Sequence, residues 1–269
     1  MMNNFLNFLD YKLGRIVFSN DNNFLINLIG SFKLRNKLFK KKSELDLNGF
    51  KLINGINTSK INDFYDNCQK KMNINNFKDY NSTKSAFSYK MDTEDIEKAF
   101  SIVKDEIILN QFEEFYRSSF VVTNIKLYRT LHFDNSVEKE QYSNFWHCDH
   151  YLKTLTKLFI FLHEVKIENG PFEYYDLNQT KKIVRKGYSG RNKNYDKSIF
   201  DNSKKERVLG NLGQGFICRT TECIHRATVP YENKFRDILQ FDIFPTENLA
   251  IDNFKKDLSP ELSKKFGKI

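Results

Sequence analysis

The apolar positions of this chain follow two spacings, helical in the first half and strand-like in the second. Ile61, Phe64 and Cys68 recur at intervals of three and four residues, which places them on one face of a helix. We therefore predict a helix over Lys60–Met72, with Ser59 as its N-cap.

The longest helical pattern runs from about Thr93 to Arg117, and Asp92 before it is a residue type that caps helix N-termini. The apolar residues at helical spacing in this segment are Ile96, Ala99, Phe100, Val103 and Ile107. We interpret the segment as a scaffold helix that packs on the rest of the fold.

Short segments rich in β-branched and aromatic residues dominate the second half of the chain. One strand-like run lies earlier, within Leu45–Ile56, where Asn-Gly pairs supply turns. The later strands are expected over Phe120–Tyr128, Lys157–Val165, Gly215–Arg219 and Phe235–Phe244. The polar stretch Asp176–Asn211 shows no apolar periodicity, and we interpret it as a functional flap or a mobile insertion. Helices followed by separated strands predict a mainly β fold, a sandwich or barrel with flanking α-helices.

The length of 269 residues suits one domain with extensions. We expect an accessory N-terminal segment over residues 1–44, a barrel domain over residues 45–245 and a polar, helical tail over residues 246–269.

The composition excludes several classes of protein. Aromatic residues make up 15% of the chain, including 26 Phe, so disorder does not describe the whole of it. No apolar run approaches the length of a membrane span and no secretory signal is visible, so we expect a cytoplasmic protein without a transmembrane segment. The four cysteines form no C-x-x-C pair, which favours reduced thiols over a disulfide framework or a zinc site.

The net charge is +9, from 43 basic and 34 acidic residues. Lysine is spread along the chain, and the one cluster spans Lys33–Lys42. Such a cluster can contact anionic lipid or a phosphate-bearing partner, but a solvated helix face explains it as well. We therefore expect no nucleic-acid partner.

The segment around His147 and Asp149 carries the clearest chemistry. On an extended chain, residues two apart point to the same side, so this imidazole and this carboxylate can converge on one centre. A second histidine would complete the two-His-one-carboxylate set that holds non-heme Fe(II) with open coordination positions.

His225 is the best candidate for the second histidine, because it follows one predicted strand and precedes another. His163 lies inside an apolar run and is interpreted as a core or strand-end residue. His132 has no ligand spacing of its own, and on a strand His150 would face away from Asp149.

Arg236 strengthens this hypothesis. It lies eleven residues after His225 and begins a strand, so it can sit beside His225 and point inward. A buried arginine needs an acidic partner, and the carboxylate of a ligand would pair with it in a bidentate manner. The alternative is a surface ion pair with Glu232 or Asp237.

With these residues in place, the chain resembles the phytanoyl-CoA dioxygenase-like branch of the Fe(II)/2-oxoglutarate oxygenases. The resemblance covers roughly Leu47 to Pro245. Its pieces, in order, are Asn48-Gly49-Phe50-Lys51-Leu52-Ile53, Trp146-His147-Cys148-Asp149, Leu158-Phe159-Ile160-Phe161-Leu162, Glu168-Asn169-Gly170-Pro171-Phe172-Glu173-Tyr174, Ile224-His225-Arg226-Ala227 and Arg236.

The resemblance implies a double-stranded β-helix, a jelly-roll or cupin-like barrel. It further implies Fe(II) held by His147, Asp149 and His225, with Arg236 gripping the distal carboxylate of 2-oxoglutarate and O2 as the oxidant. The implied activity is that of a dioxygenase that hydroxylates a C–H bond of a small molecule and releases succinate and CO2.

The chain departs from the family pattern on the substrate side. Tyr175–Thr180 replaces a Pro-Gly-Ser-His turn, and Ala227 stands where a small hydroxyl residue is common, with Thr228 next to it. The basic residues within the polar stretch Asp176–Asn211 favour an anionic or phosphate-bearing substrate, although a solvated flap explains them equally.

Two other functions remain open from the sequence. The first is a non-oxidative barrel, an isomerase or binding module, that uses the same metal ligands without an oxo acid. The second is a basic protein that binds nucleic acid or a membrane surface through Lys33–Lys42, which leaves the His-Asp-His-Arg set unexplained.

Overall fold

The computed structural model describes residues 42–71, 77–79, 85–116, 120–134, 140, 142–149, 153–188 and 197–245. The proposed N-terminal segment up to residue 41, the C-terminal tail and His150 lie outside the described residues, as does all of the basic cluster Lys33–Lys42 except Lys42.

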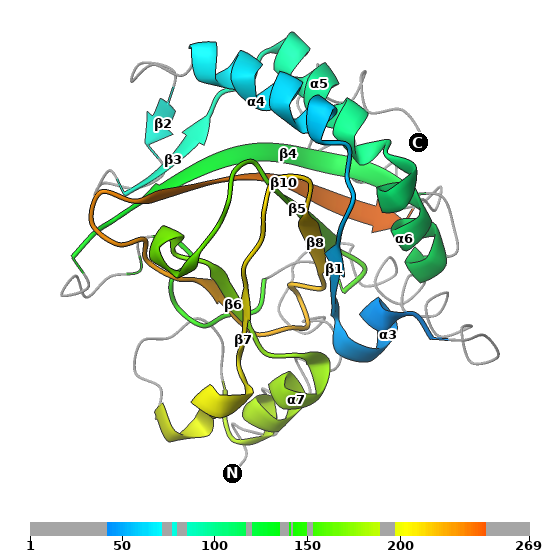
Figure 1. Cartoon of the computed structure of the whole chain (residues 1–269). Coiled ribbons are helices and arrows are strands. Elements are labelled where there is room, and N and C mark those ends of the chain that lie inside the picture. Colours follow the sequence, from blue (N-terminus) through cyan, green and yellow to red (C-terminus); the bar gives the residue numbers. More distant parts are fainter. Residues whose placement is uncertain are drawn as a thin grey trace, which may run out of the picture.

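A seven-stranded antiparallel sheet forms the larger layer of the fold (Figure 1). Its strands are β1 (Phe50–Ile53), β2 (Phe77–Asp79), β3 (Ala86–Tyr89), β4 (Phe120–Leu131), β5 (Thr156–Phe161), β8 (Gly215–Cys218) and β10 (Phe235–Pro245), in the order β1-β8-β5-β10-β4-β3-β2. The long strands β4 and β10 pair along their whole length, with a register shift between Asp242 and Ile243.

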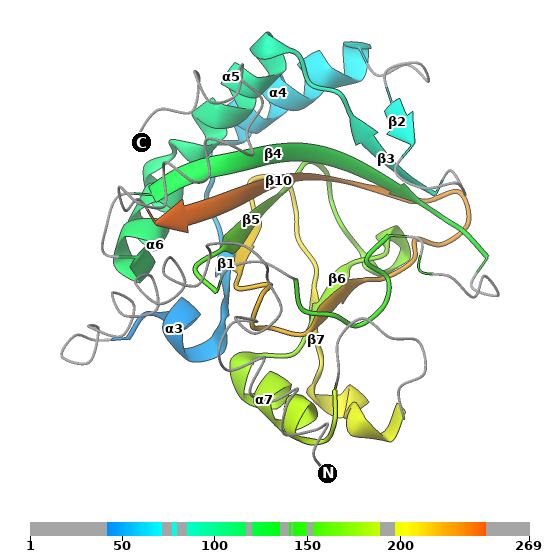
Figure 2. The same ribbon diagram turned by 180° about the vertical axis from the view of Figure 1, so that it is seen from behind.

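Three of the five helices in the described part of the chain cover one face of this sheet. The helices are α3 (Glu44–Asn48), α4 (Thr58–Lys71), α5 (Thr93–Val103), α6 (Glu106–Tyr116) and α7 (Leu177–Arg185), with 3-10 turns at Ile167–Asn169, Lys197–Ile199 and Asn202–Lys204. Both ribbon views place α4, α5 and α6 on the same side of β4 and β10 (Figures 1 and 2). Their apolar faces bury Phe64, Ile102 and Phe112 against Leu239 and Phe241 of the sheet.

A three-stranded sheet lies on the opposite side of the main sheet, in the order β7-β6-β9, with β6 at Phe172–Tyr174, β7 at Glu206–Val208 and β9 at His225–Ala227 (Figure 2). Phenylalanines from both sheets pack between them, among them Phe159, Phe161, Phe172 and Phe216. Two packed antiparallel sheets with helices on one outer face confirm the predicted mainly β, jelly-roll architecture of the double-stranded β-helix.

The predicted single helix over Thr93–Arg117 is wrong, because the chain forms two helices there, α5 and α6. The break falls at Lys104 and Asp105. The Asp105 carboxylate accepts a hydrogen bond from the backbone N–H of Ile107 at 3.0 Å, so it caps the second helix.

Two helix starts also differ from the prediction. Helix α4 begins at Thr58, and the Asn57 side chain accepts from the Lys60 N–H at 3.2 Å, so Asn57 rather than Ser59 caps the helix. Within the strand-like run Leu45–Ile56, only the part that forms β1 is a strand, because α3 precedes it.

The interpretation of Asp176–Asn211 as a stretch without apolar periodicity is wrong for its first part. Asp176 caps α7, accepting from the Gln179 N–H at 2.7 Å. Leu177, Ile183 and Val184 are buried on one face of this helix. The basic residues that dominate the composition of this segment conceal this short apolar face. In the described part of the chain, no helix is long and apolar enough to cross a membrane.

Candidate metal centre

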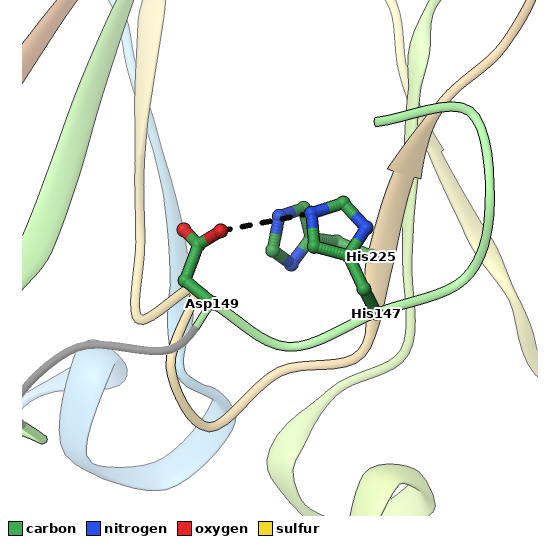
Figure 3. A group of neighbouring side chains, drawn as sticks. All are labelled: His147, Asp149 and His225. Atoms are coloured by element: carbon green, nitrogen blue, oxygen red, sulfur yellow. Dashed lines mark ion pairs between the residues drawn. The ribbon is translucent and has the colours of Figure 1, made fainter. Parts of the chain in front are cut away.

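His147, Asp149 and His225 come together in the structure, with one candidate ligand atom from each lying within 4.8 Å of the others (Figure 3). All three side chains are buried, at 1%, 8% and 5% exposure. The three side chains therefore converge as predicted. Together they form a cluster that could hold a metal ion.

The two histidines are placed by a direct backbone pairing between distant segments. The His147 N–H donates to the His225 carbonyl at 3.0 Å, and the His225 N–H donates to the His147 carbonyl at 2.8 Å. Residues paired in this way point their side chains to the same face of a sheet, and the two imidazole rings lie with centroids 4.2 Å apart.

Asp149 reaches the cluster because it lies two residues after His147 on an extended segment. Its backbone N–H donates to the Thr220 carbonyl at 2.9 Å, which anchors the segment to the turn before His225. The Asp149 Oδ1 atom lies 3.6 Å from the His147 Nε2 atom.

The hydrogen bonds of the histidines leave their Nε2 atoms available to a ligand. The Nδ1 atom of His147 lies 2.8 Å from the Phe145 carbonyl, and that of His225 lies 2.9 Å from the Cys223 carbonyl. A carbonyl only accepts, so each Nδ1 is a donor, and in the neutral tautomer that this bond selects the lone pair lies on Nε2. Burial lowers the pKa of His225 to about 3, helped by the neighbouring His147, so its imidazole is neutral, as a metal ligand must be.

A cation holds Asp149 in its ionised form. Burial alone would raise the pKa of this carboxyl, but the Lys157 ammonium and the neighbouring histidines hold it well below its usual range. The Lys157 Nζ atom lies 2.7 Å from Asp149 Oδ2. The apolar strand in which Lys157 occurs was predicted, but this contact was not.

Arg236 is buried, at 5% exposure, near the start of β10. One of its terminal nitrogens donates to the Gly170 carbonyl, and its Nε atom has no hydrogen-bond partner among the described residues. The alternative of a surface ion pair with Asp237 is wrong, because that carboxylate bonds Arg129 at 2.6 and 2.8 Å. Burial lowers the pKa of Arg236, although arginine stays charged at any ordinary pH.

The other described histidines do not join the cluster. His163 follows the end of β5, as expected of a strand-end residue, and its Nε2 atom accepts from the Asp237 N–H at 3.0 Å. His132 is exposed and bonds the Pro230 carbonyl at 2.8 Å.

No protein-family model and no curated protein matches this chain. Solved structures do. The epimerase SnoN, in complex with Fe3+, α-ketoglutarate and nogalamycin RO, has a TM-score of 0.54 at 9% identity, over 82% of this chain and 84% of SnoN.

Two further structures are similar. The non-heme α-ketoglutarate-dependent carbocyclase SnoK from nogalamycin biosynthesis has a TM-score of 0.53 at 11% identity, over 75% of this chain and 81% of SnoK. HygX from Streptomyces hygroscopicus, with nickel and 2-oxoglutarate bound, has a TM-score of 0.50 at 12% identity, over 75% of this chain and 85% of HygX. At these identities the likeness establishes that this chain shares the fold of these enzymes.

Proposed function

We propose that this protein is an Fe(II)- and 2-oxoglutarate-dependent dioxygenase that hydroxylates a C–H bond of a small-molecule substrate. In the balanced reaction, the substrate C–H, 2-oxoglutarate and O2 give the alcohol, succinate and CO2. The observation that carries the proposal is the buried set of two imidazoles and one carboxylate, on the fold that SnoN, SnoK and HygX share.

The residues of the cluster fit a divalent metal ion. The His147 Nε2 atom is buried and has no hydrogen-bond partner among the described residues, which is costly unless a ligand occupies it. Two nitrogen ligands and one carboxylate suit Fe(II) and leave coordination positions open. Bound iron would supply the oxidation of the substrate together with 2-oxoglutarate and O2.

Arg236 supports 2-oxoglutarate as the cosubstrate. A buried guanidinium without an acidic partner in the described structure is costly, and a second carboxylate on the ligand would satisfy it in a bidentate manner. A dicarboxylic oxo acid has one carboxylate for the metal and one for this arginine. The protein residues would thus orient the cosubstrate and exclude water from it.

The finer assignments belong to the same proposal. We propose that the oxygenase domain spans residues 45–245 and that it belongs to the phytanoyl-CoA dioxygenase-like branch, on the motifs described above. SnoN has been crystallised with nogalamycin RO, which supports a small-molecule substrate here. An anionic substrate remains a proposal that rests on the basic residues of α7.

The test is an anaerobic titration of the metal-free protein with Fe(II) and then 2-oxoglutarate, followed through the weak visible charge-transfer band of the chelate. The band should require both components. It should weaken strongly in Arg236→Ala and persist in Arg185→Ala, a matched change at an exposed arginine of α7. Iron binding without a band would favour the non-oxidative barrel, and absence of both would refute the metal centre.

A further inference from the structure

Lys157 lies on the inner face of the main sheet, directly beside the candidate metal centre. In β5, alternate residues Phe159 and Phe161 belong to the apolar cluster between the two sheets, so Lys157 points the same way. Its side chain is 12% exposed, and its Nζ atom lies 2.7 Å from Asp149 Oδ2. A lysine at this depth needs a partner, and Asp149 provides it.

The two oxygens of the Asp149 carboxylate therefore have different surroundings. The Oδ2 atom contacts the Lys157 ammonium, whereas Oδ1 lies 3.6 Å from the His147 Nε2 atom. Figure 3 shows Oδ1 directed toward the two imidazoles and Oδ2 directed away from them. The Lys157 ammonium and the two imidazoles thus lie on opposite sides of the Asp149 carboxylate.

The neighbouring acidic residue on the sheet has its own partners. Asp242 stands opposite Lys157 in the pairing of β5 with β10. Its Oδ1 atom accepts from the Gln240 side-chain amide at 2.8 Å, and its Oδ2 atom accepts from the Asn124 amide at 2.9 Å. These amides satisfy Asp242 locally, so the ammonium of Lys157 can be directed to Asp149.

From this geometry we propose that Lys157 is a positioning residue that restricts Asp149 to binding the metal through one oxygen. The inference rests on the proposed function. A carboxylate that binds through both oxygens would occupy two of six positions, and with the two histidines it would leave two. Restricted to Oδ1, it leaves three, the number that a bidentate oxo acid and O2 together require.

Removing the cation should therefore change the number of open positions more than the affinity for the metal. The variant Lys157→Met keeps an unbranched side chain, one atom shorter than lysine, and removes its charge. We expect its bound Mn(II) to lose about one of three exchangeable waters. Binding of 2-oxoglutarate to the metal-loaded variant should weaken about 10-fold, as expected for a residue that orients a metal ligand. Lys157→Arg, which keeps the charge, should restore both properties.

The experiment measures water-proton relaxation of the Mn(II)-loaded protein and the anaerobic Fe(II)/2-oxoglutarate charge-transfer band, in wild type and variants. Lys126→Met is the matched control, since Lys126 stands on the same face of the sheet in β4, on the far side of β10 from β5 and opposite Gln240. Lys157→Gln is the second variant if Lys157→Met does not fold. A charge-neutral variant that binds metal with wild-type relaxation and wild-type 2-oxoglutarate affinity overturns the role of Lys157. If the wild-type protein itself gives no band, the proposed function fails instead.

Discussion

The Arg226 guanidinium lies 4.4 Å from the centre of the Trp146 ring, and each of these residues directly precedes or follows a histidine of the metal cluster. Alternation along paired extended segments turns this pair to the face opposite the imidazoles. Arg226 also donates to Glu173 through two nitrogens, at 2.6 and 2.9 Å. The paired segments that bring His147 and His225 together are thus supported on their other face by a cluster of Trp146, Arg226 and Glu173.

Glu173→Gln should weaken this support. The Glu173 side chain is fully buried and also accepts from Lys205 and Arg207, so its charge offsets three cations. Loss of a buried charge with such partners should lower the free energy of unfolding by about 3 kcal/mol. Metal affinity should fall on the order of 10-fold, because the backbone of His225 is next to the disturbed contact.

Urea unfolding and Mn(II) titration measure the two effects separately. The control is Glu206→Gln, an exposed glutamate on the neighbouring strand β7, which should leave both quantities unchanged. An unchanged metal affinity in Glu173→Gln would show that the support acts on stability alone.

The same carboxylate should make stability depend on pH. Burial by itself raises the pKa of Glu173, but hydrogen bonds from Arg207 and Arg226 outweigh it and hold the pKa below its usual value. In the unfolded chain this group has a pKa of about 4.3. Its contribution is therefore present above that pH and is lost as the pH falls through the lower pKa of the folded state.

Urea unfolding of the metal-free protein at pH 6, 5, 4 and 3 checks the sign. Stability should fall toward acid, and the fall should be smaller in Glu173→Gln. If the free energy of unfolding fell equally with pH in the two proteins, groups other than Glu173 would account for the loss of stability in acid.

The fold and the candidate centre differ in how much of them was predictable. Alternation alone places the side chains of His147 and Asp149 on one side, and strands with strong β-branched and aromatic composition were predicted within a few residues of their ends. The break at Asp105 was missed because apolar spacing continues across it, while a single capping carboxylate decides where the second helix begins.

Contacts that depend on the pairing of distant strands could not be predicted from spacing. The approach of Lys157 to Asp149 requires β5 to lie next to the segment that carries the ligands, and the two arginine partners of Glu173 come from β7 and β9. The one available signal was a lysine at the inward-facing position of an otherwise apolar strand. That position is costly for a cation unless an acidic residue meets it.

Phe216→Ala should test the interior between the two sheets. Phe216 is fully buried. The centroid of its ring lies 4.7 Å from the ring centroid of Phe159 and 5.0 Å from that of Phe172. Truncation should cost about 3–5 kcal/mol of unfolding free energy, since a cavity remains where the ring was. Tyr231→Ala, at an aromatic residue with 59% exposure, is the control and should change stability little. Equal losses in the two variants would contradict the packing described.

Gly170 links backbone geometry to the candidate cosubstrate site. Its φ is +71°, and an added Cβ would lie 2.5 Å from the Pro230 nitrogen and from the Thr228 carbonyl oxygen. Its carbonyl accepts the hydrogen bond from the buried Arg236 guanidinium. Gly170→Ala should therefore shift this carbonyl, because a side chain at this φ is strained and meets fixed backbone atoms.

The expected result of Gly170→Ala is weaker binding of 2-oxoglutarate with metal affinity retained, because the strain acts on Arg236 and not on the three metal ligands. A loss of about 1.4 kcal/mol at this contact corresponds to a 10-fold rise in the Kd of 2-oxoglutarate. Gly55→Ala imposes a similar strain, at a φ of +80°, where the nearest atom to an added Cβ is Ile107 Cδ1 at 3.4 Å. If both variants lose stability alike and only Gly170→Ala loses 2-oxoglutarate affinity, the effect acts through Arg236. Equal affinities in the two variants would separate Gly170 from the cosubstrate site.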